Sequence, residues 1–278
     1  MATETRTGSG LLGFNDSNNA RRKPWLLSAD DNYVHWYAKN TPVVTQNDGT
    51  VGSVTDTEVN VWGVGNGYVM ESYNIGTQGA AAPAITASGL NIAVCANADG
   101  VGLELGHGIT ASARSYMTVG SSGYPLLFKV KFKLQSVNSF SQCFMGFRKA
   151  GAYGSTYTDY ADYAILGMVA NAGDIVTRTA VGGTDASAVD TTLNWAAGET
   201  HTLAMRVSPG GAVSWYVDGL TPAAQVNATT SYVFTNALNI IPFFTIIRNA
   251  TNPTNTVEII EWECGFDYTL FNFGTGGF

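Results

Sequence analysis

Two short runs of alternating apolar and polar residues, joined by a tight link, constrain this chain more than any other feature. Alternate residues are apolar in 203–207 and again in 213–217. Because successive side chains of a strand leave opposite faces of a sheet, each run is typical of a half-buried strand. The link Ser208-Pro209-Gly210-Gly211 suits a type II turn, which needs a positive φ at Gly210. The sequence therefore predicts an antiparallel hairpin over 199–219.

Composition limits the classes of protein to which the chain can belong. The 278 residues can bury the core of one large β domain with an added arm. Charged residues make up 13% of the chain, against about 25% in ordinary globular proteins, while aromatic residues reach 12%. This balance argues against disorder. The net charge of −7 argues against a nucleic-acid partner, because phosphate binding needs a basic field.

The cysteines and the apolar runs give no sign of a special compartment or a metal. Cys95, Cys143 and Cys264 are odd in number and widely spaced, so they predict buried thiols in a reducing cytosol. The N-terminus has no apolar signal core, and no run approaches the length of a membrane span. We expect a soluble chain with no export signal, no membrane contact, no metal and no cofactor.

Residues 1–58 differ from the rest because turn formers dominate and alternation is weak. They also hold too many apolar anchors for a pure linker. We interpret them as an extended N-terminal arm that packs on its own domain or on a neighbour. Its expected partner-binding residues are Arg21, Arg22, Trp25, Leu27, Trp36 and Tyr37. For the basic triplet at 21–23 we favour a solvated patch over a phosphate contact.

Strand signals follow one another at short intervals over residues 59–270. Besides the hairpin, the candidate strands are 59–62, 68–73, 91–95, 101–105, 126–135, 140–147, 163–170, 174–180, 239–247 and 256–264. We expect 140–147 to be the hairpin mate of 126–135, and 163–170 to pair with 174–180. No segment shows a sustained helical period. The sequence predicts an all-β, two-sheet antiparallel sandwich at 59–270 and a Gly/Phe-rich tail at 271–278.

Strand 126–135 is amphipathic. Its apolar residues alternate with Lys129, Lys131 and Lys133, which share the opposite face. Such a row can contact a partner, but a solvated face or protection of a sheet edge is the expectation we favour.

The hairpin also carries a family likeness. Its two strands resemble the late strands of concanavalin A-like/laminin-G-like jelly-roll domains. The first contains His201-Thr202-Leu203, and the second ends in Tyr216-Val217-Asp218-Gly219. The strands from 126 to 169 and the last strand, 257–262, fit the same pattern. The resemblance covers about residues 60–270 and implies a jelly-roll sandwich. This fold hosts lectins, lyases, hydrolases and assembly modules alike, so it implies no single activity.

The overall composition and layout of the sequence are similar to those of bacteriophage virion proteins. The chain is acidic, lightly charged and rich in Gly, Thr, Ala and Asn, and it begins with an arm. This likeness implies a capsid cement or decoration protein, or a tail-associated protein, assembled in the host cytoplasm. Its partners would be the major capsid protein or other virion proteins, and it would be a homotrimer.

The sequence contains only weak matches to known catalytic motifs. Family 16-type glycoside hydrolases share the sandwich and place a Glu-x-Asp-x(x)-Glu motif on a central strand, whereas 258–263 here lacks the Asp. Glu261 and Glu263 share a strand face and could form a carboxyl pair for retaining hydrolysis. We favour exposed strand carboxylates instead. His35, His107 and His201 stand outside any triad context, and we expect a structural hydrogen bond from His201.

A tyrosine-rich segment between two predicted strands is the expected exposed recognition surface. It contains Tyr153, Tyr157, Asp159, Tyr160 and Asp162. Its rings could stack on a sugar or bury area against a protein. The two aspartates are the best oxygen ligands for calcium, although solvated loop acids are the favoured interpretation.

The function we expect is therefore non-enzymatic. The leading hypothesis is a virion cement or decoration protein that binds neighbouring capsid subunits through its arm and sandwich surface. The alternative is a carbohydrate-binding, lectin-like module of a phage tail or fibre that uses the segment around Tyr157. A polysaccharide-cleaving enzyme using Glu261 and Glu263 ranks third.

Overall fold

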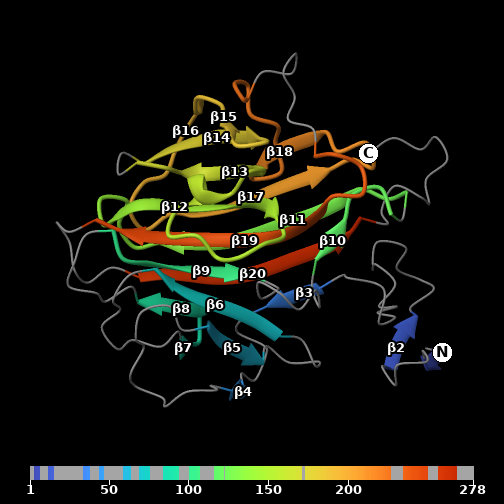
Figure 1. Cartoon of the computed structure of the whole chain (residues 1–278). Coiled ribbons are helices and arrows are strands. Elements are labelled where there is room, and N and C mark those ends of the chain that lie inside the picture. The colour runs from blue at the N-terminus through green and yellow to red at the C-terminus, as the bar shows by residue number, and fades with distance from the viewer. Residues whose placement is uncertain are drawn as a thin grey trace.

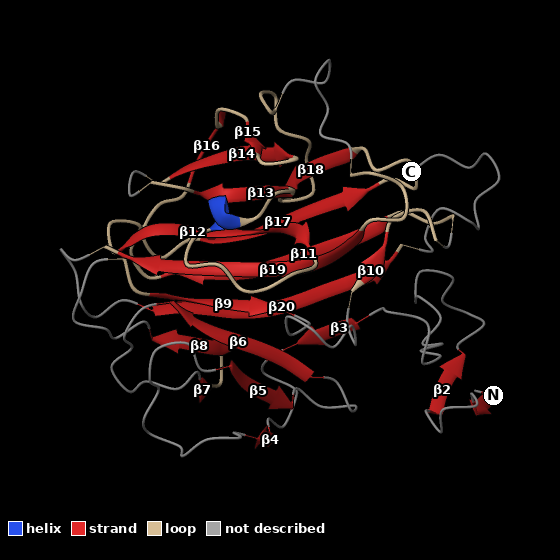
Figure 2. Cartoon of the chain, in the orientation of Figure 1, coloured by secondary structure: helices blue, strands red, loops and turns tan. Residues whose placement is uncertain are grey.

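A computed structural model of the chain describes residues 3–6, 12–15, 34–37, 44–46, 59–63, 69–75, 84–93, 100–106, 116–121, 123–170, 173–226, 234–249 and 256–267. Within these ranges nearly all regular structure is β (Figures 1 and 2). The helical structure of the described residues is one 3-10 turn, Tyr157–Asp159. Two large antiparallel sheets pack face to face. The predicted all-β, two-sheet jelly-roll sandwich is confirmed.

The smaller sheet has seven described strands. In spatial order they are β18 (Val213–Val217), β17 (Thr200–Val207), β11 (Leu126–Leu134), β20 (Thr256–Phe266), β8 (Leu90–Ala93) and β7 (Ala84–Ile85), with β3 (Val34–Tyr37) also paired to β20. We call it the seven-stranded sheet.

The larger sheet has eleven described strands. In spatial order they are β15 (Thr184–Asp185), β14 (Asp174–Val181), β13 (Tyr163–Met168), β12 (Phe140–Lys149), β19 (Asn239–Arg248), β9 (Gly102–Gly106), β6 (Val69–Ile75), β5 (Val59–Gly63) and β4 (Val44–Gln46). Strand β10 (Met117–Thr118) also pairs with β19, and β16 (Val189–Asn194) with β14. We call it the eleven-stranded sheet.

The core lies between the two sheets, and alternation places its side chains. On β11 the apolar residues are buried while the intervening lysines are partly exposed. Phe128 meets Phe147 of the opposite sheet at 5.9 Å between ring centroids, and Phe132 meets Phe244 at 4.9 Å. Burying each such ring stabilises the fold by about 1.5–3 kcal/mol.

The predicted hairpin over 199–219 is confirmed, but its turn type is not. Strands β17 and β18 pair from Leu203 opposite Val217 to Val207 opposite Val213. The amide of Gly211 donates to the carbonyl of Ser208, and the positive φ, 87°, falls on Gly211 rather than on Gly210. The prediction of a type II turn was wrong. A glycine in the left-handed region after the turn lets the link match the twist of the two strands.

The predicted pairing of 126–135 with 140–147 was also wrong. Strand β11 pairs with β17 and β20, whereas β12 pairs with β13 and β19 in the other sheet. The short link between β11 and β12 therefore crosses from one sheet to the other. The pairing of β13 with β14 occurs as predicted.

The lysine row of β11 faces glutamates. Lys129 lies opposite Glu263 of β20, Lys131 opposite Glu261, and Lys133 opposite Glu258. Because β11 lies between β17 and β20, the row does not protect a sheet edge. Opposite charges across neighbouring strands stabilise this register.

The N-terminal segment contributes strands to both sheets. Strand β3 pairs with β20 in the seven-stranded sheet, and β4 pairs with β5 in the eleven-stranded sheet. Strands β1 (Thr3–Arg6) and β2 (Leu12–Asn15) pair with each other in a separate sheet. The predicted arm, 1–58, therefore contains strands that pack on its own domain. The predicted tail, 271–278, lies outside the described residues.

Candidate functional site

The outer face of the eleven-stranded sheet, opposite the central core, carries a second apolar cluster. Phe144, Tyr163 and Phe243 lie there, on β12, β13 and β19. Tyr157 and Tyr160 join this cluster from the segment between β12 and β13, which we call the covering segment, residues 150–162. Its 3-10 turn is the one drawn in blue in Figure 2, beside β12 and β13. The covering segment therefore packs its aromatic side chains onto the sheet.

A buried ion pair lies beneath the covering segment. Arg148 on β12 is fully buried, and Glu104 on β9 is 2% exposed. The Nε of Arg148 donates to Oε1 of Glu104 at 2.8 Å, and its Nη1 donates to the carbonyl of Gly151 at 3.2 Å. The hydroxyl of Tyr160 donates to Oε2 of Glu104 at 2.6 Å and accepts from the amide of Gly154 at 3.0 Å. One carboxylate thus holds both the sheet arginine and the covering segment.

Aromatic rings surround the guanidinium of this pair. Its carbon lies 4.4 Å from the ring centroid of Tyr160 and 5.2 Å from that of Tyr153. Tyr153 also stacks on Tyr73 of β6, with centroids 4.6 Å apart and planes 4° from parallel. Burial, and then the nearby charge of Glu104, raise the pKa of Tyr160 well above its ordinary value. The phenol therefore remains a hydrogen-bond donor at physiological pH.

A second polar network lies farther along the same face. The hydroxyl of Tyr163 donates to Oδ1 of Asp185 at 2.5 Å, and Arg178 forms a bidentate ion pair with the same carboxylate. Arg178 also donates through Nη1 to the hydroxyl of Tyr157 at 2.5 Å. Burial raises the pKa of Tyr163, and so does its hydrogen bond to Asp185. This network ties the covering segment to β14 and β15.

The prediction that the tyrosines of this segment form an exposed recognition surface was wrong for two of them. Tyr157 is 5% exposed and Tyr160 is 7% exposed, and Tyr153 is half-buried. The hydroxyl of Tyr160 donates to buried Glu104 and that of Tyr157 accepts from partly exposed Arg178, while both rings pack on the sheet. An amphipathic residue of this kind is as well suited to a covered sheet face as to an interface.

The two aspartates of the segment have structural roles. Asp159 accepts hydrogen bonds from the amides of Ser155 and Thr156 at 2.8 and 3.2 Å. Asp162 accepts from the amide of Gly182 at 2.8 Å. No group of three or more His, Cys, Asp or Glu side chains suited to a metal ion occurs in the described ranges.

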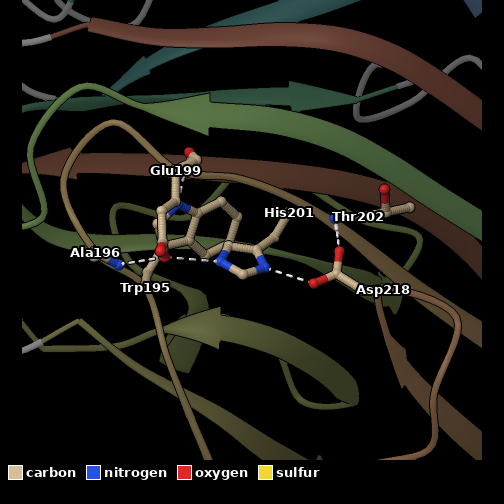
Figure 3. A network of polar contacts seen from close by, with 6 residues as sticks. All are labelled: Trp195, Ala196, Glu199, His201, Thr202 and Asp218. Carbon is tan, nitrogen blue, oxygen red and sulfur yellow. Dashed lines mark hydrogen bonds and ion pairs between the residues drawn. The ribbon is translucent and has the colours of Figure 1, made fainter.

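A histidine at the start of the central hairpin lies between two carboxylates (Figure 3). Nδ1 of His201 is 2.6 Å from Oδ2 of Asp218, and Nε2 is 3.2 Å from Oε2 of Glu199. Asp218 also accepts from the amide of Thr202 at 2.8 Å. Both ring nitrogens therefore face carboxylate oxygens of neighbouring residues. The expected structural hydrogen bond of His201 is confirmed.

The same histidine is fixed from the side of the core. Its ring meets the ring of Trp195 edge to face, with centroids 4.6 Å apart (Figure 3). The indole nitrogen of Trp195 donates to the carbonyl of Glu199 at 3.1 Å. The carboxylate of Glu199 accepts from the amide of Ala196 at 2.9 Å. These contacts join the turn before β17 to the turn after β18.

The contacts of Glu199 lead us to expect that the stability of the fold depends on pH. The amide of Ala196, and then His201, lower the pKa of Glu199 below its ordinary value of 4.5. A lowered pKa in the folded state means that the contribution is present above pH 4.5 and is lost as the pH falls through the folded pKa. We expect Glu199→Gln to reduce the melting temperature at pH 6, and the difference from wild type to disappear in more acidic buffer. Thermal unfolding between pH 3 and pH 6 measures this, and a constant difference would contradict it.

The carboxylates considered for hydrolysis lie on the outer face of the seven-stranded sheet. Glu261 and Glu263 share a face, as predicted, because both contact the ammonium of Lys129, at 2.8 and 2.6 Å. They are 9% and 3% exposed, so the expectation of exposed carboxylates was wrong. The two carboxylates therefore share one cation on this face of the sheet.

The arm residues fall into two groups. Trp36 and Tyr37 belong to β3 and lie opposite Trp262 and Glu261 of β20. The structure does not describe the other four, Arg21, Arg22, Trp25 and Leu27.

No described helix is long and apolar enough to cross a membrane.

Sequence reasoning missed the charged residues at the centre of the covered face. Glu104 is the single charge in an apolar strand, between Leu103 and Leu105. Arg148 follows the run 143–147 of β12, which has no charge, and precedes Lys149, the last residue of that strand. A charge next to apolar residues of a strand indicates a buried partner, and these two of opposite sign could have been paired on that ground.

Comparisons with known proteins gave structural likenesses only. No protein-family description matches the chain, and no curated protein matches its sequence. A β-glucanase of Bacillus licheniformis has 12% identity and a TM-score of 0.46, over 82% of this chain and 98% of that one. An alginate lyase of Pseudomonas aeruginosa has 14% identity and a TM-score of 0.44, over 66% and 84%. A galectin of Caenorhabditis elegans has 15% identity and a TM-score of 0.33, over 58% and 95%. We take neither activity nor substrate from these likenesses.

Proposed function

We propose that the chain is a non-enzymatic structural protein of a virus particle. It would be a cement or decoration protein that binds neighbouring shell subunits through its N-terminal segment and its sandwich surface. The observation that carries this proposal is the covered outer face of the eleven-stranded sheet. Tyr157 and Tyr160 pack there on Phe144 and Phe243, above the Arg148 ion pair.

The charged side chains of the two outer faces support a role without catalysis. Glu104 is held by Arg148 and Tyr160, and Lys129 is shared by Glu261 and Glu263. Glycoside hydrolysis needs one carboxyl group that donates a proton and another that stays free to attack or to activate water. The ion pairs that hold these carboxylates support our proposal of a structural role for them.

The N-terminal segment supports a role in assembly. Its strand β3 joins the seven-stranded sheet, while β1 and β2 pair with each other apart from both large sheets. With β3 and β4 anchored in the two large sheets, the first strands of the segment can reach a neighbouring subunit. Contacts of roughly 1,600 Å², repeated over a shell, stabilise an assembly even where each one is weak. We propose a homotrimer that binds the major capsid protein, assembled in the host cytoplasm.

Immunogold electron microscopy of particles of the virus that encodes the chain tests this function. Antibodies against the purified protein should label the shell, and particles of an unrelated virus serve as the control. Label confined to tail fibres would favour the lectin-like alternative, and unlabelled particles would contradict a virion role.

Truncation of the N-terminal segment tests its role in binding. The truncation should stop before Val34, because β3 and β4 pair with the two sheets. A chain lacking residues 1–33 should stay folded and bind particles at least tenfold more weakly.

A glycan array separates the lectin-like alternative from the proposed function. The rings of Tyr157 and Tyr160 are buried, so they offer no stacking platform in this structure. We expect no glycan to bind, with or without a calcium chelator. Binding that is lost in Tyr153→Ala, the half-buried ring of the segment, would favour the alternative.

A further inference from the structure

Arg248, at the end of β19, is buried without a partner for its guanidinium. The residue is 3% exposed, and its Nε and Nη1 are buried atoms with no hydrogen-bond partner. No carboxylate of the described residues forms an ion pair with it. The other arginines whose side chains the structure describes all have such a partner: the pairs are Arg148 with Glu104, Arg178 with Asp185, and Arg206 with Asp267.

The side chain of Arg248 lies on the core side of the eleven-stranded sheet. Phe244 and Ile246 precede it at intervals of two residues on β19, and both belong to the central core. Alternate residues of a strand share one face, so Arg248 faces the same way. Phe140, its partner in the register of β12, also belongs to that core. A permanent positive charge therefore lies at one end of an apolar interior.

The backbone around Arg248 is paired, so only the side chain lacks partners. Its amide donates to the carbonyl of Val101 at 2.9 Å, and its carbonyl accepts from the amide of Gly100 at 3.2 Å. The amide of Asn249 donates to the carbonyl of Ser139 at 2.9 Å. These bonds join the end of β19 to the residues that lead into β9 and β12, and they fix the position of Arg248.

A guanidinium in this position requires a negative charge beside it. Arginine stays protonated in proteins, so it cannot lose its charge on burial. Burying an unpaired charge is strongly unfavourable. The planar guanidinium matches the oxygens of carboxylates and phosphates, which it binds through two parallel hydrogen bonds. The chemistry of the group therefore selects an oxyanion.

We propose that Arg248 binds a small oxyanion from solution, either a phosphate or a carboxylate compound. The oxygens of the anion accept hydrogen bonds from the guanidinium, and its charge compensates the buried positive charge. Because Arg248 is 3% exposed, its covered position suits a small anion rather than the surface of a macromolecule. The bound anion stabilises the end of β19. This inference does not depend on the proposed virion role.

Thermal unfolding of the full chain in different salts tests the site. Sodium phosphate, sodium acetate and sodium chloride are compared at pH 7 and at equal ionic strength. We expect about 50 mM phosphate or acetate to raise the melting temperature by at least about 3 °C over chloride, because the folded state alone binds the anion. A rise with phosphate only would identify a phosphate site, and a rise with acetate a carboxylate site. No rise with either anion would overturn the proposal.

A substitution without charge assigns the effect to this residue. Arg248→Met should show the same melting temperature in all three salts, and in chloride it should be at least as stable as wild type, because no uncompensated charge remains. Arg178→Met is the matched control, since Arg178 has its own carboxylate partner. This control should keep the rise with the oxyanion. A rise that persists in Arg248→Met would overturn the proposal.

Direct binding keeps the test valid if Arg248→Met fails to fold. Isothermal titration calorimetry with phosphate or acetate, whichever raised the melting temperature, should show saturable binding of one anion per wild-type chain. Arg248→Lys keeps the positive charge but lacks the planar pair of donors, so it should bind at least tenfold more weakly. Absence of saturable binding to the wild-type chain, or equal affinity in Arg248→Lys, would overturn the proposal.

Discussion

Replacing Arg148 by alanine should lower the free energy of unfolding by about 3–5 kcal/mol. The substitution leaves the carboxylate of Glu104, 2% exposed, without its cationic partner beneath the covering segment. An uncompensated buried charge costs far more than an exposed ion pair contributes. Urea unfolding followed by tryptophan fluorescence measures the change.

The neighbouring residue provides a matched control for this substitution. Lys149 is half exposed and lies 3.9 Å from Asp162, so Lys149→Ala should cost no more than about 0.5 kcal/mol. Replacing both buried partners, Arg148→Met with Glu104→Leu, should recover most of the loss because no charge is then stranded. A loss below about 1 kcal/mol in Arg148→Ala would show that the pair is not buried as described.

Replacing Phe243 by alanine should cost about 3–5 kcal/mol. Its fully buried ring meets Tyr160 and Phe144 edge to face, with centroids 5.8 and 5.7 Å apart. Removing the ring opens a cavity between the outer face of the sheet and the covering segment. We also expect faster proteolysis within residues 150–162. Denaturant unfolding and limited proteolysis measure the two effects.

An exposed apolar residue serves as the control for the ring substitution. Leu220 is 73% exposed, so Leu220→Ala should change the free energy of unfolding by less than about 0.5 kcal/mol. If Phe243→Ala cost no more than this control, the covering segment would not pack on the sheet.

The alternation of single strands predicted much of the fold. The hairpin of β17 and β18 and the wet face of β11 both follow from a period of two residues. The same period says which face of a strand is buried, but not which strand lies beside it. The link between β11 and β12 therefore looked like a hairpin, whereas it crosses between sheets. The prediction of the turn type failed for a related reason, since adjacent glycines offer the chain two places for a positive φ, and the structure has it at Gly211.

The candidate site was harder to predict because its residues come from distant strands. Glu104 and Arg148 are 44 residues apart, and only the pairing of β9 and β12 with β19 brings them together. The tyrosines of the covering segment were found by sequence but given the wrong surroundings. The continuous apolar run of β12 was the available signal, because a strand covered on both faces shows no alternation.

Hydrogen exchange of the covering segment tests the central claim, that this segment closes the outer face as a fixed part of the fold. The amides of Gly154, Ser155 and Thr156 donate to Tyr160 and Asp159. We predict that they exchange at least a hundredfold more slowly than an unstructured peptide, and at the same rate with and without a panel of oligosaccharides. Exchange at the rate of an open loop, or protection that changes when a sugar is added, would contradict the claim and indicate a ligand groove.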